Sequence, residues 1–182
     1  MADRVFLLDR SGSMETCRDD TIGGFNAFVK DQVALDGTLS LIQFDHEYLP
    51  MYDKKPIGEV EALTLETFKP RGSTALLDAI GKTIKAIEPD RKPTVIILTD
   101  GLENASNKFT KAHIKDLIDQ KTAEGWTFLY LGANQDAFAE AGAIGIAPAG
   151  TLNYDSRKTP EVFRALSQAM SSQGPVNFNV IQ

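Results

Sequence analysis

The stretch VFLLDRSGSM, residues Val5–Met14, decides how the start of this chain folds. Four apolar residues in a row are typical of a buried strand, and they end at Asp9, with serines at the next two alternate positions. A later stretch, TVIILTDG (Thr94–Gly101), has the same form: an apolar run that ends near Asp100 and a glycine. We therefore expect two buried strands, each ending in a carboxylate.

Short apolar runs alternate with segments of helical period along the whole chain, which is typical of an α/β fold with a mainly parallel sheet. Only Asp45 and His46 separate the second and third expected strands, so these should pair as an antiparallel hairpin, with Pro50 on an edge strand. No element is assigned to the tail after Gly174. Strands are expected at residues 5–8, 38–45, 47–53, 94–101, 126–133 and 152–154, and helices at about 22–33, 76–87, 114–118, 136–142 and 162–170.

Length and composition are those of an ordinary globular protein, with 182 residues, 42% of them hydrophobic and 24% charged. We expect a single domain over residues 1–182, with its core at about 4–172. The net charge of −6 argues against a nucleic-acid or anionic-membrane binder, because both need a basic surface. Short apolar runs, a first run that belongs to the core and a single cysteine, Cys17, together favour the cytoplasm.

The two strand-ending aspartates suggest a shared site. In an open doubly wound sheet, sites form beyond the carboxyl ends of the strands, where the winding direction reverses. If Asp9 and Asp100 meet there, their carboxylates repel unless a cation lies between them. Ser11, Ser13 and Thr74 would add hydroxyl oxygens. A set of oxygen ligands suits a hard divalent ion such as Mg²⁺, Mn²⁺ or Ca²⁺ rather than zinc or copper.

These five positions also carry a family resemblance. Asp9-x-Ser11-x-Ser13, then Thr74, then Asp100-Gly101 resembles the metal-ion-dependent adhesion site (MIDAS) of the von Willebrand factor type A (vWA) domain family. The likeness runs from the first expected strand to the last expected helix, and it is closest to the compact single-domain forms of bacteria and their viruses. It implies a Rossmann-like, doubly wound, mainly parallel sheet with one antiparallel edge strand and helices on both faces.

The resemblance also implies a function. Ser11, Ser13 and Thr74 would coordinate a divalent cation through their hydroxyls, with Mg²⁺ expected first and Mn²⁺ or Ca²⁺ as alternatives. Asp9 and Asp100 would bind the ion directly or through waters, and an Asp or Glu of a partner protein would complete its coordination. We therefore expect a metal-dependent protein-binding module without catalysis, with neither nucleic acid nor membrane as a partner. The partner's identity, the pathway and the oligomeric state stay open.

Three other functions stay open beside this one. A Mg²⁺-dependent phosphatase would need an acid two positions after its nucleophilic aspartate, where this chain has Ser11. A nucleotide-binding protein would lack both common phosphate-binding motifs, GxxxxGK[ST] and GxGxxG. A vWA scaffold could also bind a partner without any metal.

Several polar residues near the expected site have more than one interpretation. Asp45 could face the crevice, but a solvated carboxylate in a hairpin is the favoured prediction. Glu103 and Asn104 could line the rim of the site or belong to an ordinary polar loop. Asn134 or Asp136 is expected to cap the following helix, since such side chains accept hydrogen bonds from its first N–H groups, and a ligand role for this segment is the alternative.

Overall fold

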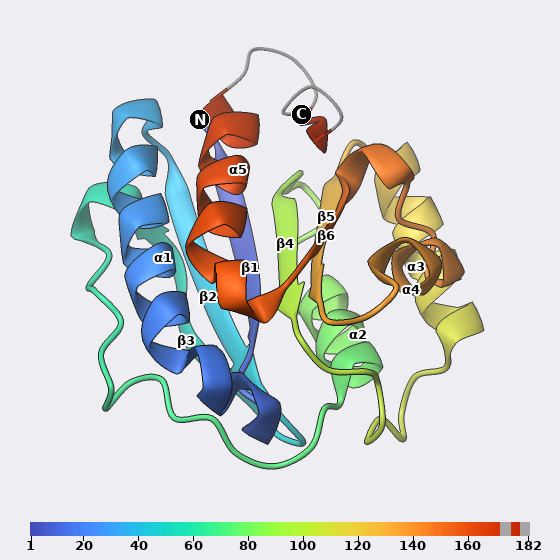
Figure 1. Cartoon of the computed structure of the whole chain (residues 1–182). Coiled ribbons are helices and arrows are strands. Elements are labelled where there is room, and N and C mark those ends of the chain that lie inside the picture. Colours follow the sequence, from blue (N-terminus) through green and yellow to red (C-terminus); the bar gives the residue numbers. More distant parts are fainter. Residues whose placement is uncertain (172–175, 179–182) are drawn as a thin grey trace.

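The structure, a computed structural model, describes residues 1–171 and 176–178. Its centre is a six-stranded sheet in the order β3-β2-β1-β4-β5-β6 (Figure 1). All neighbouring strands are parallel except β2 and β3, which form an antiparallel pair at one edge. The predicted α/β fold with one antiparallel edge strand is therefore confirmed. The strands are β1 (Asp3–Asp9), β2 (Thr38–Phe44), β3 (Tyr48–Pro56), β4 (Thr94–Thr99), β5 (Thr127–Ala133) and β6 (Thr151–Tyr154).

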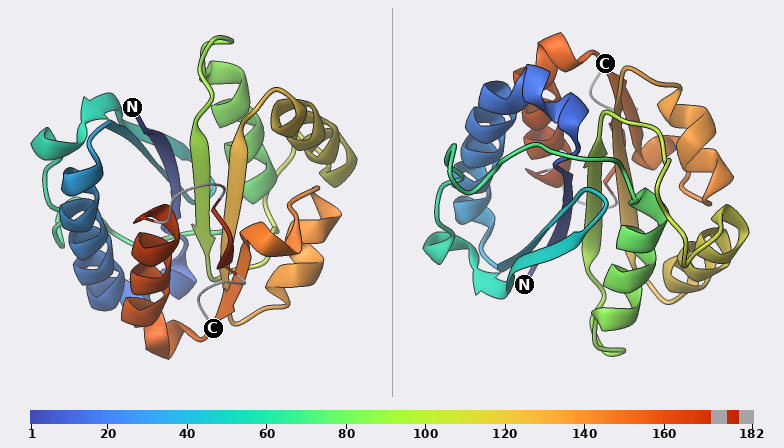
Figure 2. Two further views of the ribbon diagram at one scale, coloured as in Figure 1. Left: turned by 90° about the horizontal axis from the view of Figure 1, so that it is seen from above. Right: turned by 90° about the horizontal axis from the view of Figure 1, so that it is seen from below.

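Helices cover both faces of the sheet (Figures 1 and 2). Side chains of α1 and α5 belong to one hydrophobic cluster, and those of α2, α3 and α4 to a second cluster on the opposite face. The helices are α1 (Arg18–Gln32), α2 (Leu76–Ala86), α3 (Lys111–Ala123), α4 (Ala137–Ala143) and α5 (Thr159–Ser171). Within the described ranges, no helix combines the length and the apolar character that a membrane span requires.

The central strands are continuous apolar runs because both of their faces are covered. In β1, Phe6 and Leu8 belong to the cluster with α1 and α5, whereas Val5 and Leu7 belong to the other cluster. The ring of Phe6 packs edge-on against that of Phe25 in α1, with the centroids 5.4 Å apart. Burial of this kind contributes about 1.5–3 kcal/mol for each large side chain, so β1 is firmly fixed in the core.

The winding direction of the sheet reverses between β1 and β4. From β1 the chain goes outward to β2 and β3 on one side, and from β4 it goes outward to β5 and β6 on the other. Because β1 and β4 are paired in parallel, with Leu8 opposite Leu98, their carboxyl ends meet at the same edge of the sheet. We call this the loop edge; the right view of Figure 2 is seen from this side, and the N-terminus lies at the opposite edge (Figure 1).

Some element bounds differ from the sequence expectations. The hairpin is confirmed, but β3 starts at Tyr48, runs to Pro56 and contains a register irregularity. Helix α3 extends beyond residues 114–118 at both ends, and Thr110 caps its start by accepting the N–H of His113. In the tail, which received no prediction, Phe178 is buried in the hydrophobic cluster on the face of the sheet that α1 and α5 cover.

Candidate metal site at the loop edge

Two serines and two aspartates form one chain of contacts where β1 and β4 end. The Ser11 backbone N–H donates to Oδ1 of Asp9 over 2.7 Å. The hydroxyl oxygens of Ser11 and Ser13 are 3.2 Å apart, and the Ser13 hydroxyl donates to Oδ1 of Asp100 over 2.7 Å. The loop after β1 thus bridges the ends of the two central strands.

Thr74 joins this group from a different loop. A β-carbon built on Gly101 would lie 3.0 Å from Oγ1 of Thr74 and 3.7 Å from the hydroxyl oxygens of Ser11 and Ser13. Three hydroxyls therefore surround one point beside Gly101, and any larger residue at that position would put its side chain among them. The structure brings together all five side chains singled out in the sequence.

The spacing of these oxygens suits a small cation. Ligands at ~2.1 Å on adjacent corners of an octahedron lie roughly 3.0 Å from each other. The separations of 3.2 Å between the two serine hydroxyls and 2.7 Å between Ser13 and Asp100 lie on either side of that value. Hydroxyl and carboxylate oxygens are also the ligand types that Mg²⁺, Mn²⁺ and Ca²⁺ accept. The residues present therefore fit a hard divalent ion.

The two carboxylates are buried without a basic partner. Asp9 is fully buried, and its second oxygen accepts a hydrogen bond from the Thr99 hydroxyl over 2.7 Å. Burial raises the pKa of Asp9 to about 6, and the nearby charge of Asp100 adds to the rise while hydrogen bonds from Thr99 and Ser11 oppose it. Burial likewise raises the pKa of Asp100.

No basic side chain in the described ranges forms an ion pair with Asp9 or Asp100. Nor do any three His, Cys, Asp or Glu side chains of residues 1–171 and 176–178 gather as a metal cluster. The candidate ligands at this edge are therefore two carboxylates and three neutral hydroxyls, and a divalent cation would supply the positive charge that the surrounding protein does not.

Asp45 holds the loop that carries Thr74, and the prediction of a solvated carboxylate was wrong. Its side chain is fully buried, and Oδ2 lies 2.9 Å from Nε of Arg71 and 3.1 Å from Nε of Arg10. Its Oδ1 accepts the N–H of Glu47, and its backbone carbonyl accepts the N–H of Ala75. The two arginines neutralise the charge, which is why this carboxylate can leave solvent.

Backbone contacts complete this connection between the loops. The Arg71 N–H donates to the Arg10 carbonyl over 2.8 Å, and the Gly12 N–H donates to the Gly72 carbonyl over 3.0 Å. Gly72 has φ +70°, and a β-carbon there would lie 2.3 Å from Nδ1 of His46, so the tight approach requires glycine. The loop before α2 is thus fixed directly against the loop after β1.

The segment after Asp100 supports Thr74 from the other side. The Asn104 side-chain oxygen accepts the Thr74 N–H over 2.8 Å, and the N–H groups of Asn104 and Ala105 donate to the Thr74 carbonyl. Glu103 accepts N–H bonds from Ala105 and Ser106 within the same loop. Of the two interpretations offered for Glu103 and Asn104, the structure favours loop-building roles for both.

A further support comes from the loop between β5 and α4. The Gln135 side-chain amide lies 3.4 Å from the Gly101 carbonyl and 3.5 Å from the Thr99 carbonyl, and its oxygen accepts the Tyr130 hydroxyl. Asp136 caps α4 by accepting the Ala139 N–H, as expected. Sequence reasoning missed Gln135 and Thr99, although both directly flank residues that it had singled out.

Comparison with known proteins gives the fold. No family model matches the chain. The vWF domain of the type V pili tip protein Mfa5 from Porphyromonas gingivalis superposes with a TM-score of 0.68 at 12% identity, covering 97% of this chain and 98% of that one. The chain has the vWA fold. The vWA-type order of strands and helices therefore matches the architecture expected from the sequence motifs.

Two further similar structures carry metals. Proximal thread matrix protein 1 from the mussel byssus, solved with a zinc-occupied MIDAS motif, has a TM-score of 0.67 at 18% identity, over 94% of this chain and 48% of that one. Manganese-loaded TRAP protein of Plasmodium vivax has a TM-score of 0.61 at 14% identity, over 89% of this chain and 71% of that one. At these identities the likeness establishes the vWA fold only.

A curated protein is also similar in sequence. An uncharacterized protein of Synechocystis sp. is 27% identical over 183 aligned positions, which cover 96% of this chain and 43% of that protein. The chain thus spans less than half the length of this relative and of the mussel protein.

Proposed function

We propose that this chain binds a divalent cation, Mg²⁺ in the first instance, and uses the bound ion to hold an Asp or Glu side chain of a partner protein. Ser11, Ser13 and Thr74 would bind the ion through their hydroxyls, with Asp9 and Asp100 beside it. The observation that carries this proposal is the meeting of three hydroxyls from two loops around one point at Gly101, next to the Asp100 carboxylate.

The charges of these ligands explain why a carboxylate should be the incoming group. Three neutral hydroxyls do not reduce the charge of a divalent ion. Both carboxylate oxygens of Asp9 already accept hydrogen bonds, one from the Ser11 N–H and one from the Thr99 hydroxyl. An ion held in this way keeps much of its positive charge, so an anionic oxygen can replace one of its waters. Nothing in this scheme calls for a nucleophile or a general acid, and we propose binding without catalysis.

The metal-bearing relatives support a divalent ion but do not select one. The mussel protein holds zinc in its MIDAS and the Plasmodium protein holds manganese. Both metals therefore belong in any test beside Mg²⁺ and Ca²⁺, even though an oxygen-only ligand set is better suited to the harder ions.

Manganese titration tests the metal site. Electron paramagnetic resonance of free Mn²⁺ should reveal one site in the wild-type protein, and competition should rank Mg²⁺, Ca²⁺ and Zn²⁺. Ser13→Ala and Thr74→Ala should each weaken Mn²⁺ binding at least tenfold. Ser73→Ala is the matched control, because Ser73 adjoins Thr74 and donates or accepts no side-chain hydrogen bond in the described structure. Equal affinity in all four proteins would refute the site.

Water-proton relaxation tests the open position on the ion. Mn²⁺ on the protein should enhance the relaxation of exchanging water, and acetate or a short Asp-containing peptide should reduce the enhancement by displacing that water. The same peptide with Asn in place of Asp should have no effect. An enhancement that acidic peptides leave unchanged at millimolar concentration would contradict carboxylate recognition while leaving metal binding in place.

A further inference from the structure

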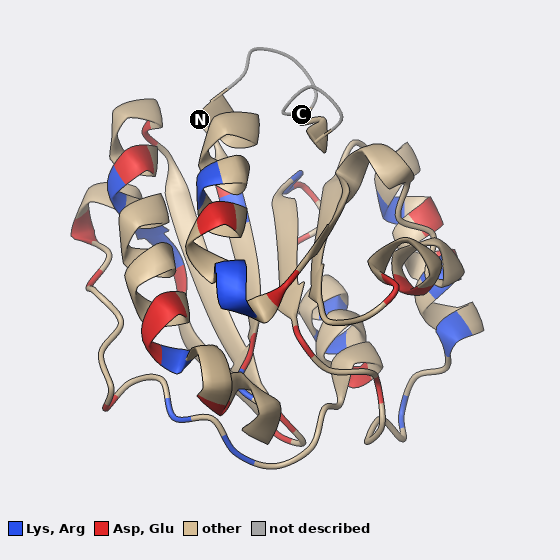
Figure 3. Cartoon of the chain, viewed as in Figure 1, with Lys and Arg blue, Asp and Glu red and all other residues tan. Residues whose placement is uncertain are grey.

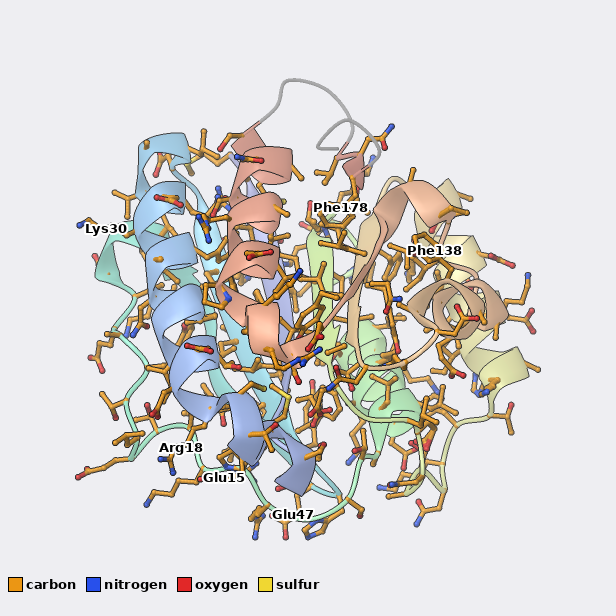
Figure 4. The ribbon with its side chains drawn as sticks, viewed as in Figure 1. Glu15, Arg18, Lys30, Glu47, Phe138 and Phe178 are labelled. Carbon is orange, nitrogen blue, oxygen red and sulfur yellow. The ribbon has the colours of Figure 1, made fainter. Side chains whose placement is uncertain are left out.

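A polar pocket of about 240 Å³ lies directly beside the metal site, on the side of α2. Its walls come from the β2–β3 turn (His46 and Glu47), from the start of α2 and from the loop after β4. Figure 4 labels Glu47 at this loop edge, and Figure 3 shows acidic and basic residues together along these loops. We call it the α2 pocket; Lys82 and Lys108 also line it.

The α2 pocket and the metal site share the backbone that carries Thr74. Ala75, the next residue, lines the pocket, and so does Ala105, whose N–H donates to the Thr74 carbonyl over 3.1 Å. A partner segment that has one side chain at the metal and runs toward α2 would place its neighbouring residues over this pocket.

The carboxylates around the pocket are already occupied. The Asp78 side chain is 9% exposed and accepts three backbone N–H bonds, from Asn107, Lys108 and Phe109, each over 3.0 Å. Glu47 accepts the Arg71 guanidinium over 2.6 Å. Asp78 keeps its charge, but backbone N–H groups bind both of its oxygens, and Glu47 is paired with Arg71, so neither carboxylate forms an ion pair with a lysine of the pocket.

The lysines of the pocket, by contrast, have no acidic partner. Neither Lys82 nor Lys108 lies within 4.0 Å of a carboxylate oxygen of the described residues. The Lys82 ammonium lies 5.4 Å from the centre of the Tyr48 ring, a contact that leaves its N–H groups free for an anion. A polar pocket with two such lysines is complementary to an anionic group.

We propose that the α2 pocket receives a second carboxylate of the same partner segment, so that the protein recognises a pair of nearby acidic residues rather than one. The inference rests on the proposed function, because the first carboxylate is the one at the metal. One acidic side chain binds the ion and its neighbour binds Lys82 and Lys108. The second contact sets which acidic segments are preferred.

The expected gain in affinity is modest and measurable. Ion pairs at a partly exposed site contribute roughly 0.2–1 kcal/mol each, so two lysines correspond to about a two- to thirtyfold gain in affinity. The gain should fall as ionic strength rises, since salt screens partly exposed charges.

Capped glycine-based peptides, added to the Mn²⁺-loaded protein, test the inference by displacement of metal-bound water. One peptide carries a single Asp, and others carry a second Asp one, two or three positions later, with Asn at that place as the isosteric control. The best two-Asp peptide should bind at least threefold more tightly than its Asp/Asn counterpart. This preference should disappear in Lys82→Gln/Lys108→Gln.

The matched control is Lys30→Gln/Lys92→Gln, which removes the same charge from exposed positions away from the pocket and should keep the preference. If the wild-type protein binds neither Mn²⁺ nor the single-Asp peptide, or binds only one of them, the proposed function is overturned, and this inference with it. A single-Asp peptide that binds, without any gain from a second Asp, would overturn the inference alone. A gain that survives in Lys82→Gln/Lys108→Gln would also overturn it.

Discussion

Asp9 and Asp45 occupy comparable places at the ends of two neighbouring parallel strands, yet their surroundings differ. Both side chains are fully buried. Asp45 has two arginine side chains within 3.1 Å, whereas Asp9 has a backbone N–H and a hydroxyl. One buried carboxylate is thus neutralised by the protein itself. The other is hydrogen-bonded but keeps a charge that the described protein does not balance.

This difference separates a structural carboxylate from a candidate metal ligand. A buried ion pair is costly to break, because removing one partner leaves the other charge buried and alone. A buried carboxylate without a counter-ion is costly to keep until a cation binds, and it therefore couples folding stability to metal binding. The predictions below test each half of this comparison.

The largest effect is expected at Asp45. Asp45→Asn should lower the free energy of unfolding by about 3–5 kcal/mol, because Arg10 loses its counter-charge in a site that is only 11% exposed. Urea unfolding in EDTA measures it. Glu47→Gln, at a neighbouring exposed residue, is the control and should change stability by no more than about 0.5 kcal/mol. Equal stability of Asp45→Asn and wild type would show that the arginines do not depend on this carboxylate.

The next effect concerns metal affinity at Asp9. Asp9→Ala should weaken Mn²⁺ binding about 100-fold or more, since it removes a carboxylate from the ion's immediate surroundings and frees Ser11 and Thr99. The Mn²⁺ titration described above measures it, and circular dichroism should show that the fold is retained. Unchanged affinity would mean that Asp9 is structural in the same sense as Asp45.

Asp9→Asn should raise the free energy of unfolding when no metal is present, whereas Asp45→Asn should lower it. The pKa of Asp9 rises from 3.8 to about 6 on folding, so the folded state holds this proton more tightly than the unfolded state. The stability linked to that proton is fully present below pH 3.8 and is lost as pH rises through about 6.

In EDTA at pH 8, Asp9→Asn should therefore be more stable than wild type, by up to about 3 kcal/mol. The difference should shrink towards zero as pH falls to about 4. Thermal unfolding of both proteins at each pH isolates this group, because other titrations are common to the two. A variant that is less stable than wild type at pH 8 would contradict the absence of a counter-charge at Asp9.

The smallest effect distinguishes the two arginines. Arg10→Gln should lower the free energy of unfolding by about 1–2 kcal/mol, because Arg10 is nearly buried against Asp45. Arg71→Gln should lower it less, since 48% of that side chain is exposed and solvent screens its charge. Urea titrations of both variants check the order. The reverse order would assign the main counter-charge of Asp45 to Arg71.

The sequence was sufficient for the fold and for the meeting of Asp9 with Asp100, because both follow from local patterns, whereas Thr74 joined the predicted set through the family resemblance. Apolar runs that end in Asp9 and near Asp100 mark two central strands, and parallel strands place their carboxyl ends at one edge. The α/β sheet with its antiparallel edge follows from the same alternation of runs and from the short Asp45-His46 connection.

The missed features depend on contacts between distant segments. Asp45 looks like a turn residue by itself, and its burial follows only from Arg71, 26 positions away, and from Arg10. Asn104 likewise receives its role from the Thr74 backbone, 30 positions away. Arg10 and Arg71 do adjoin the site motifs, in DRSGS and PRGST, but no local pattern says which acid they will meet.

The direction of β1 has a practical consequence for binding experiments. The strand begins at Asp3, at the edge opposite the loop edge, and ends with Asp9 at the loop edge, a path of roughly 20 Å at the usual rise of a strand. A sensor chip, bead or fluorescent label coupled through the amino terminus would therefore lie at the edge farthest from the metal site, and the ion with its surrounding loops would face the solution.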